Sequence, residues 1–204
     1  MTGLRARHKA DRTRRMQEAA ARLFREVGYG AARMEDIAAA ADVSVGTLYN
    51  YFETKGDLLL AIVSMEVEEV LAAGAAVLDA PPADPAEALD RLIGGYYDHS
   101  LVYLSKAMWR TAMALSIESP DTPFSQRYTA LDGMLTDQVC AMVATLQRRG
   151  RLKDGVPARL VGEVLFNNLN QMFMEFVKAE PIAMETLRAS VRRQTALVVG
   201  LLVP

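Results

Sequence analysis

The segment Val45–Phe52 carries side chains whose types and spacing suit hydrogen bonding along one face of a helix. At 100° per residue, a small residue, a hydroxyl and an amide fall on the outward face: Gly46, Thr47 and Asn50. Thr and Asn side chains can bond base edges or phosphates, and a helix face of this size fits the major groove of duplex DNA. The segment therefore predicts a DNA-reading helix.

Residues at the edges of this face add to the same chemistry. Val45 and Tyr49 lie at one edge, where Val can touch a thymine methyl, and Tyr51 lies at the other edge. Tyr49 and Lys55 are placed for phosphate contacts. Periodicity alone leaves a second interpretation open: an ordinary helix-turn-helix within a bundle, whose Tyr and Asn side chains are only surface residues.

Two short helices, over residues 34–41 and 45–52, must position this face. Their apolar residues are spaced to form a small core between crossed helices: Ile37, Ala38, Ala41, Val43, Leu48 and Phe52. Asp42 lies at the turn, where Asp tolerates left-handed dihedrals better than most residues do. Ser44 is placed to cap the second helix.

Charge is distributed unevenly along the chain. Residues 1–55 carry ten Lys/Arg and seven Asp/Glu, a net charge of +3, whereas the remainder carries −5. The densest basic cluster is Arg5, Arg7, Lys9, Arg12, Arg14 and Arg15. A basic arm on an otherwise acidic protein predicts a polyanion at that end. The alternative is a solvated, disordered N-terminus.

Few residues could support catalysis or metal binding. The histidines are His8, in the basic arm, and His99, and the lone cysteine, Cys140, is typical of a small buried hydrophobe in a helix. The sequence has no Gly-rich phosphate loop, His-Glu-x-x-His or Cys-x-x-Cys motif. We therefore expect no enzyme, no metal and no cofactor. A helical adaptor or ligand-binding protein that uses the same segment for protein contacts stays open.

Apolar periodicity predicts an all-α fold of about nine helices. One stripe runs from Met16 to Val27, with Gly28 and Gly30 ending that helix, and Thr54–Asp57 resembles a capping box that opens a long helix. Later helices are expected over residues 85–96, 106–116, 125–149, 157–178 and 185–203. The composition shift near residue 54 predicts two domains, 1–55 and 56–204.

The expected location of the chain is cytoplasmic. A lone thiol cannot form an intrachain disulfide, which points to a reducing compartment. The first residues lack the apolar core of a signal peptide, and no run of about eighteen apolar residues could span a membrane.

From Arg14 to Met65 the chain resembles the DNA-binding head of tetracycline-repressor (TetR) family regulators. The matching elements follow in order at the family's usual spacing: Ala20-x-x-Leu23-Phe24 with Gly28-Tyr29, Ile37-Ala38-x-x-Ala41-x-Val43-Ser44, Gly46-Thr47-Leu48-Tyr49-x-Tyr51-Phe52, and Lys55-x-x-Leu58-Leu59. The remainder of the chain resembles the family only in helix count and length.

The resemblance implies a homodimer on a palindromic operator, usually a repressor that a small molecule releases by binding residues 56–204. It also implies DNA contacts, with Gly46 at the closest approach, for Ser44, Val45, Thr47, Tyr49, Asn50 and Lys55. Arg33 stands where the family usually has Thr or Ser just before the first short helix. Arg caps a helix poorly, but it can contact phosphate as a cation. A regulator without a small-molecule effector is a further alternative.

The last two predicted helices carry apolar stripes. The resemblance implies a four-helix interface between two copies, built from Leu165, Leu169, Phe173, Phe176, Val191, Val198 and Leu202. The alternative is that both stripes pack within one chain.

Candidate effector-lining residues combine aromatic and Met surface with a few polar groups, so we expect an apolar or aromatic effector. They are Tyr96, His99, Tyr103, Trp109, Met113, Phe124, Asn167, Asn170 and Met174.

Overall fold

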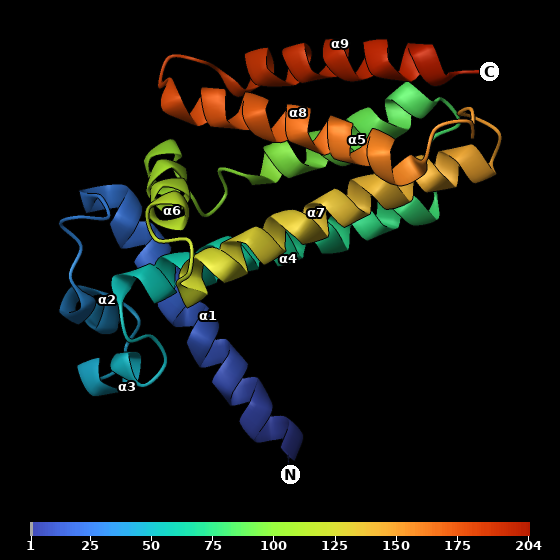
Figure 1. Ribbon diagram of the computed structural model, residues 1–204. Helices are drawn as coiled ribbons and strands as arrows, with labels where there is room; N and C mark the ends of the chain where they lie inside the picture. The colour runs from blue at the N-terminus through green and yellow to red at the C-terminus, as the bar shows by residue number, and fades with distance from the viewer. Residues whose placement is uncertain (1) are drawn as a thin grey trace. The chain divides into compact units, whose positions relative to one another are not determined.

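The computed structural model describes residues 2–204, with side chains from residue 6 onward, so the side chain of Arg5 lies outside the described residues. Across this range the chain forms nine helices and no strand, which confirms the predicted all-α fold (Figure 1). The helices divide between two compact units. The first unit contains the residues up to Met65 and Val102–Tyr128, and the second contains Glu66–Leu101 and Thr129–Pro204.

The first unit is built on α1 (Thr2–Val27), α2 (Met34–Ala40), α3 (Val45–Tyr49) and α6 (Lys106–Glu118), with the starts of α4 (Lys55–Asp79) and α7 (Pro123–Arg148). The later part of α1 buries Met16, Ala20 and Phe24 of the predicted stripe, whereas Val27, its last residue, is 53% exposed. Each large side chain buried in this way contributes about 1.5–3 kcal/mol. Gly28, at φ +84°, follows the last residue of α1, as the sequence predicts.

The second unit holds α5 (Pro85–His99), α8 (Ala158–Lys178) and α9 (Met184–Leu202), with the later parts of α4 and α7. Gln138 of α7 joins three of these helices. Its Nε2 donates to the Leu71 carbonyl of α4 at 2.8 Å, and its Oε1 accepts from the Tyr96 hydroxyl of α5 at 2.8 Å. Gly74 leaves room for this amide, because a Cβ there would lie 2.2 Å from Gln138 Oε1.

Helices α7 and α8 cross at a glycine. A Cβ at Gly162 would lie 2.6 Å from the Cα of Cys140, so only a residue without a side chain allows this approach. The backbone of α8 therefore lies directly against α7 at this point.

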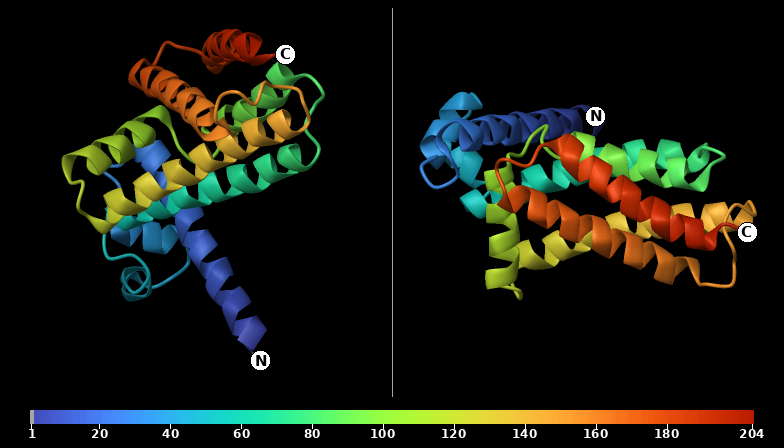
Figure 2. Two further views of the ribbon diagram at one scale, coloured as in Figure 1. Left: turned by 45° about the vertical axis from the view of Figure 1, so that its right-hand side comes forward. Right: turned by 90° about the horizontal axis from the view of Figure 1, so that it is seen from above.

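Helices α8 and α9 form an antiparallel hairpin and lie side by side in both views of Figure 2. Asn168 of α8 donates to Gln194 of α9 across it at 2.8 Å. On the inner side, the Tyr97 hydroxyl of α5 donates to the Leu169 carbonyl at 2.9 Å, and its ring stacks on Phe173 at 6.0 Å. The apolar stripe of α8 thus faces the core of its own chain.

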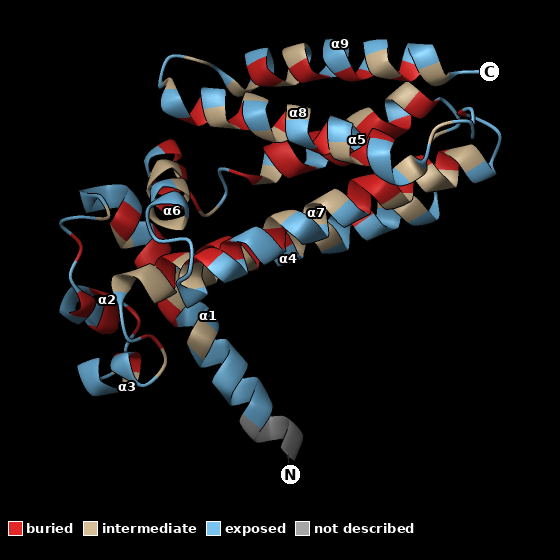
Figure 3. Ribbon diagram, viewed as in Figure 1, coloured by how far each residue is buried: buried red, intermediate tan, exposed pale blue. Residues whose placement is uncertain are grey.

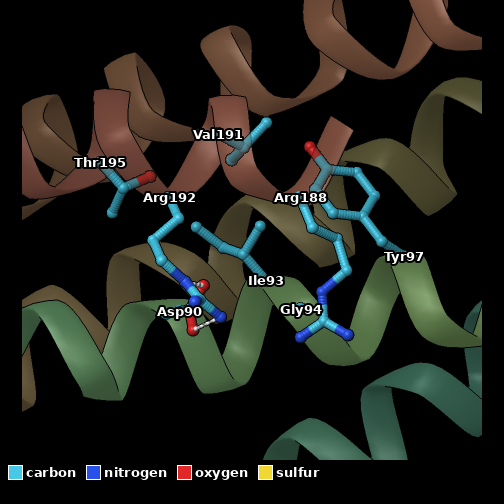
Figure 4. A pocket seen from close by; sticks show the side chains of 8 residues that line it. All are labelled: Asp90, Ile93, Gly94, Tyr97, Arg188, Val191, Arg192 and Thr195. Atoms are coloured by element: carbon cyan, nitrogen blue, oxygen red, sulfur yellow. Dashed lines mark hydrogen bonds and ion pairs between the residues drawn. The ribbon is translucent and has the colours of Figure 1, made fainter. Parts of the chain in front are cut away.

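Two ion pairs hold α9 against α5. Arg192 lies 2.8 Å from Asp90 (Figure 4), and Arg188 lies 2.5 Å from Asp98. The cavity between the two helices measures about 10 Å³, which is room for about one water molecule. Ligand pockets typically measure about 300–1,000 Å³, so this cavity is a packing gap and not an effector site.

Candidate nucleic-acid interface

Helix α3 is held in place by its own start. Ser44 is the N-cap, as predicted: its Oγ accepts from the Thr47 backbone N at 3.1 Å and lies 2.8 Å from Thr47 Oγ1. Asp42 precedes it at φ +54°, the left-handed conformation expected at the turn. Leu48 is fully buried, so the opposite face of α3 must point outward.

That outward face presents the predicted polar set. Val45, Gly46, Tyr49 and Asn50 are exposed, whereas Thr47 and Tyr51 are half-buried. A Cβ at Gly46 would meet nothing within 4 Å. Packing inside the chain therefore does not require a glycine there, and a close approach of an outside molecule gives a physical reason for one.

Helix α3 is shorter than the sequence predicts. It ends at Tyr49, not Phe52, and Asn50 is its C-cap. The Asn50 N–H still donates to the Gly46 carbonyl at 3.1 Å, so the Asn50 side chain keeps its helical position. The N–H groups of Tyr51 and Phe52 both donate to the Leu48 carbonyl at 3.0 Å in the turn that follows α3, and Phe52 is buried as its spacing predicts.

Arg33 stands at the N-cap of α2 without a capping hydrogen bond from its side chain. Its Nε lies 3.4 Å from Glu35 Oε2, and both side chains are largely exposed. The start of α2 therefore lacks a side-chain cap, and the exposed guanidinium agrees with the predicted phosphate contact.

Lys55 has a structural role that the sequence did not indicate. Its Nζ donates to the carbonyls of Tyr29 and Gly30, both at 2.9 Å, and lies 5.1 Å from the centroid of the Tyr29 ring. An ammonium group has three donors, so one remains for a phosphate. Burial, followed by the charge of Asp57, raises the pKa of the Tyr29 hydroxyl and keeps this ring neutral.

The start of α4 is a reciprocal capping box, as predicted. The Thr54 N–H donates to Asp57 at 2.9 Å, and the Asp57 N–H donates to Thr54 Oγ1 at 3.1 Å. Lys55 is the first residue of α4. The capping box therefore holds the lysine backbone where its side chain can reach the loop after α1.

Known proteins share sequence with the segment that forms this interface. Residues 18–62 match the family described as "Bacterial regulatory proteins, tetR family". The matched residues run from the later part of α1 to the start of α4, so this part of the chain is similar to the DNA-binding domain of that family. It is similar to the HTH-type transcriptional repressor KstR of Rhodococcus jostii, with 27% identity over 163 residues that cover 78% of this chain and 71% of KstR. This chain is accordingly a DNA-binding transcriptional regulator.

Two solved structures show the same fold over nearly the whole chain. A TetR-family protein of Mesorhizobium loti has a TM-score of 0.73 and 20% identity, covering 96% of this chain and 98% of that one. FadR of Thermus thermophilus, solved with lauroyl-CoA, has a TM-score of 0.67 and 22% identity, covering 94% and 96%. The chain therefore shares the fold of these two proteins also in the helices after residue 62.

The predicted effector residues are divided between the two units. Tyr103, Trp109, Met113 and Phe124 belong to the first unit, and the other five belong to the second. Trp109 is buried and Phe124 stacks on Tyr128 at 6.4 Å, whereas Tyr103 accepts a hydrogen bond from Arg14 and Asn167 is exposed. Asn170, Met113 and Met174 are half-buried.

The two remaining candidates are tied to polar partners. Burial raises the pKa of Tyr96, whose hydroxyl donates to Gln138. His99 lies between two carboxylates of α4, with Nδ1 2.6 Å from Glu66 and Nε2 3.2 Å from Glu69. These contacts fix both side chains within the second unit.

The predicted dimer residues are largely covered by their own chain. Val198 and Leu202 are half-buried, and the others are buried: Leu165, Leu169, Phe173, Phe176 and Val191. The exposed apolar residues of α8 and α9 lie on the outer side of the hairpin. They are Leu160, Val164, Leu197 and Leu201.

Sequence reasoning missed Gln138 and Asp132 of α7. Burial raises the pKa of Asp132 to about 6, from 3.8. The folded chain then holds a proton that the unfolded chain releases, so this carboxyl disfavours folding increasingly as pH rises from 3.8 to about 6. Leu131 on one side of it is buried and Gly133 on the other side is exposed, so its sequence neighbours give no consistent signal of this burial.

None of the helices in the described part of the chain has the length and apolar character needed to cross a membrane. Nor do its His, Cys, Asp and Glu side chains gather in groups of three or more that could hold a metal ion.

Lys55→Met tests whether Lys55 is structural as well as a DNA contact. Methionine keeps the apolar stem but removes the donors to Tyr29 and Gly30, so we expect a loss of about 1–2 kcal/mol of stability. Urea unfolding and thermal melting measure it. An unchanged stability together with weaker DNA binding would show that the ammonium serves DNA alone.

Proposed function

We propose that the protein is a homodimeric repressor whose two α3 helices read the half-sites of a palindromic operator and which a small apolar or aromatic effector releases. The outward face of α3 carries this proposal, above all Gly46, whose missing side chain no contact within the chain requires. Arg33, Ser44, Val45, Thr47, Tyr49, Asn50, Tyr51 and Lys55 complete the proposed DNA-contact set. Phosphate contacts position the helix, and Thr47 and Asn50 read bases.

The proposed DNA-binding and effector-binding segments meet at the sequence boundary near residue 55. Residues 1–55 bind DNA, and residues 56–204 bind the effector and dimerise. Helix α4 begins at this boundary and continues into the second unit. A ligand that moves α4 would change the separation of the two recognition helices, which must stay near one turn of DNA, about 34–36 Å.

The outer side of the α8–α9 hairpin supports the proposed dimer. Leu197 and Leu201 of α9 are 69% and 72% exposed, and Leu160 and Val164 of α8 are at least half exposed. The Asn168–Gln194 hydrogen bond joins the two helices about one turn away from Val164 and Leu197. Because the inner stripe is already covered, these outward residues are the ones that a second copy can bury.

The proposed effector has a long apolar part, of the fatty acyl-CoA class. FadR of Thermus thermophilus was solved with lauroyl-CoA and shares the fold of this chain. Apolar, aromatic and Met side chains among the predicted lining residues suit an acyl chain. Ligand and DNA would oppose each other through a coupling of about 1–3 kcal/mol, acting equally in both directions.

Substitution of Thr47 and Asn50 tests the reading face. Thr47→Ala with Asn50→Ala removes both groups that read bases, so binding to duplex DNA from the gene's own upstream region should weaken by about 10-fold or more. Fluorescence anisotropy with that duplex and a scrambled duplex measures it. Equal binding of both duplexes by the unmodified protein would overturn the regulator proposal, and a lowered melting temperature would show that these residues support the fold instead.

The dimer surface can be tested by charge. Leu197→Lys with Leu201→Lys places four cations in the proposed symmetric interface, so the protein should become monomeric in sedimentation velocity. Ile117→Lys is the matched control, because Ile117 is 74% exposed on α6 and lies off the hairpin. Dimers that persist in the double variant at low micromolar concentration would exclude this surface.

Lauroyl-CoA tests the effector class, with free coenzyme A as the control that lacks the acyl chain. Lauroyl-CoA should weaken operator binding by about 5–150-fold, and operator DNA should weaken lauroyl-CoA binding by the same factor. Anisotropy and calorimetry measure the two sides. Lauroyl-CoA that stabilises the protein but leaves operator affinity unchanged would contradict the release mechanism, and a failure to bind would exclude the class.

A further inference from the structure

The basic N-terminal arm is a helix. Helix α1 begins at Thr2, and its residues 6–12 are all exposed, as the pale turns near the N-terminus in Figure 3 show. Only the later part of α1, from Met16 onward, is buried against the rest of the first unit. The basic side chains therefore project from the first turns of α1, which is one continuous helix.

The helical repeat divides these cations between two faces. Lys9 and Arg12 precede Met16 by seven and four residues, so they continue the face that packs inward farther along α1. Arg7 and Arg14 lie on the opposite face, where Arg14 is bonded to Glu18 at 2.9 Å and to Tyr103 at 3.2 Å. The two faces thus meet different surroundings.

A contact with Tyr51 places the Lys9–Arg12 face beside the reading face of α3. Lys9 Nζ lies 5.9 Å from the centroid of the Tyr51 ring, within reach of a cation–π contact. Tyr51 is at the edge of the reading face opposite Val45 and Tyr49. The major groove is about 12 Å wide and bounded by a phosphate strand on each side, so α3 in the groove would leave one strand on the Tyr51 side.

We propose that Lys9 and Arg12 bind the phosphate backbone of duplex DNA beside each half-site, on the side of the groove marked by Tyr51. This inference rests on the proposed operator binding and adds a second contact to it, outside the helix-turn-helix. Phosphate contacts carry no base information, so the pair strengthens and orients binding without changing which sequence is bound.

The salt dependence of operator binding tests the proposal. In the dimer, Lys9→Gln with Arg12→Gln removes four phosphate contacts, so the slope of log K against log salt should become shallower by about 3.6. Between 50 and 200 mM salt, the loss of affinity should then be about 100-fold smaller than for the unmodified protein. The preference for the upstream duplex over a scrambled duplex should stay the same.

Arg7→Gln with Arg14→Gln is the matched control, because it removes the same charge from the other face of the same helix. The slope of log K against log salt for this control should differ from that of the unmodified protein by no more than about one. Equal effects of both double variants would show general electrostatic attraction and overturn the proposal, as would an unchanged slope in the Lys9/Arg12 variant. Circular dichroism checks that both variants keep their helix content.

Phosphate ethylation interference gives a second readout that helix stability does not mimic. Ethylation beside each half-site should weaken binding of the unmodified and control proteins but not of the Lys9/Arg12 variant. If the unmodified protein shows no sequence-specific binding, the proposed function fails. If it binds specifically but its interference pattern matches that of the Lys9/Arg12 variant, only this second contact fails.

Discussion

The ammonium group of Lys55 joins parts of the DNA-binding head that are distant in the sequence. It stands at the start of α4 and donates to two carbonyls of the loop that follows α1. Beneath it, the Tyr29 ring meets Phe24 of α1 edge-on, with 5.1 Å between the ring centroids. Helices α2 and α3 lie in the sequence between Gly30 and Lys55. The hydrogen bonds of this one ammonium group therefore fix both ends of the segment that contains α3.

Local signals in the sequence were enough to predict the head. Ser44 as N-cap, Asp42 in a left-handed turn and the Thr54–Asp57 capping box are each decided by residues within a few positions of one another. The end of α3 was predicted too late, because apolar spacing marks the burial of Phe52 but not the residue at which the helix ends. The role of Lys55 was missed because its partners lie 25 and 26 residues away.

The second unit shows where periodicity stops being informative. The stripes of α8 and α9 were visible in the sequence, but periodicity does not say whether a stripe faces its own chain or a second copy. Contacts of Tyr97 show that the stripe of α8 faces its own chain. The Tyr97 hydroxyl donates to the Leu169 carbonyl, and its ring stacks on Phe173. Likewise, Gln138 could be recognised only after α4 and α5 were placed around it.

The glycine crossing of α7 and α8 has a consequence for chemical access. It encloses Cys140, the one thiol of the chain, whose Sγ donates to the Arg159 carbonyl at 3.5 Å. Burial raises the pKa of this thiol, so little nucleophilic thiolate exists at neutral pH. Alkylating reagents then reach the sulfur mainly when the two helices separate, and the rate of labelling follows local opening of the second unit. The labelling rate of this natural cysteine therefore reports how often the unit that is proposed to bind the effector opens.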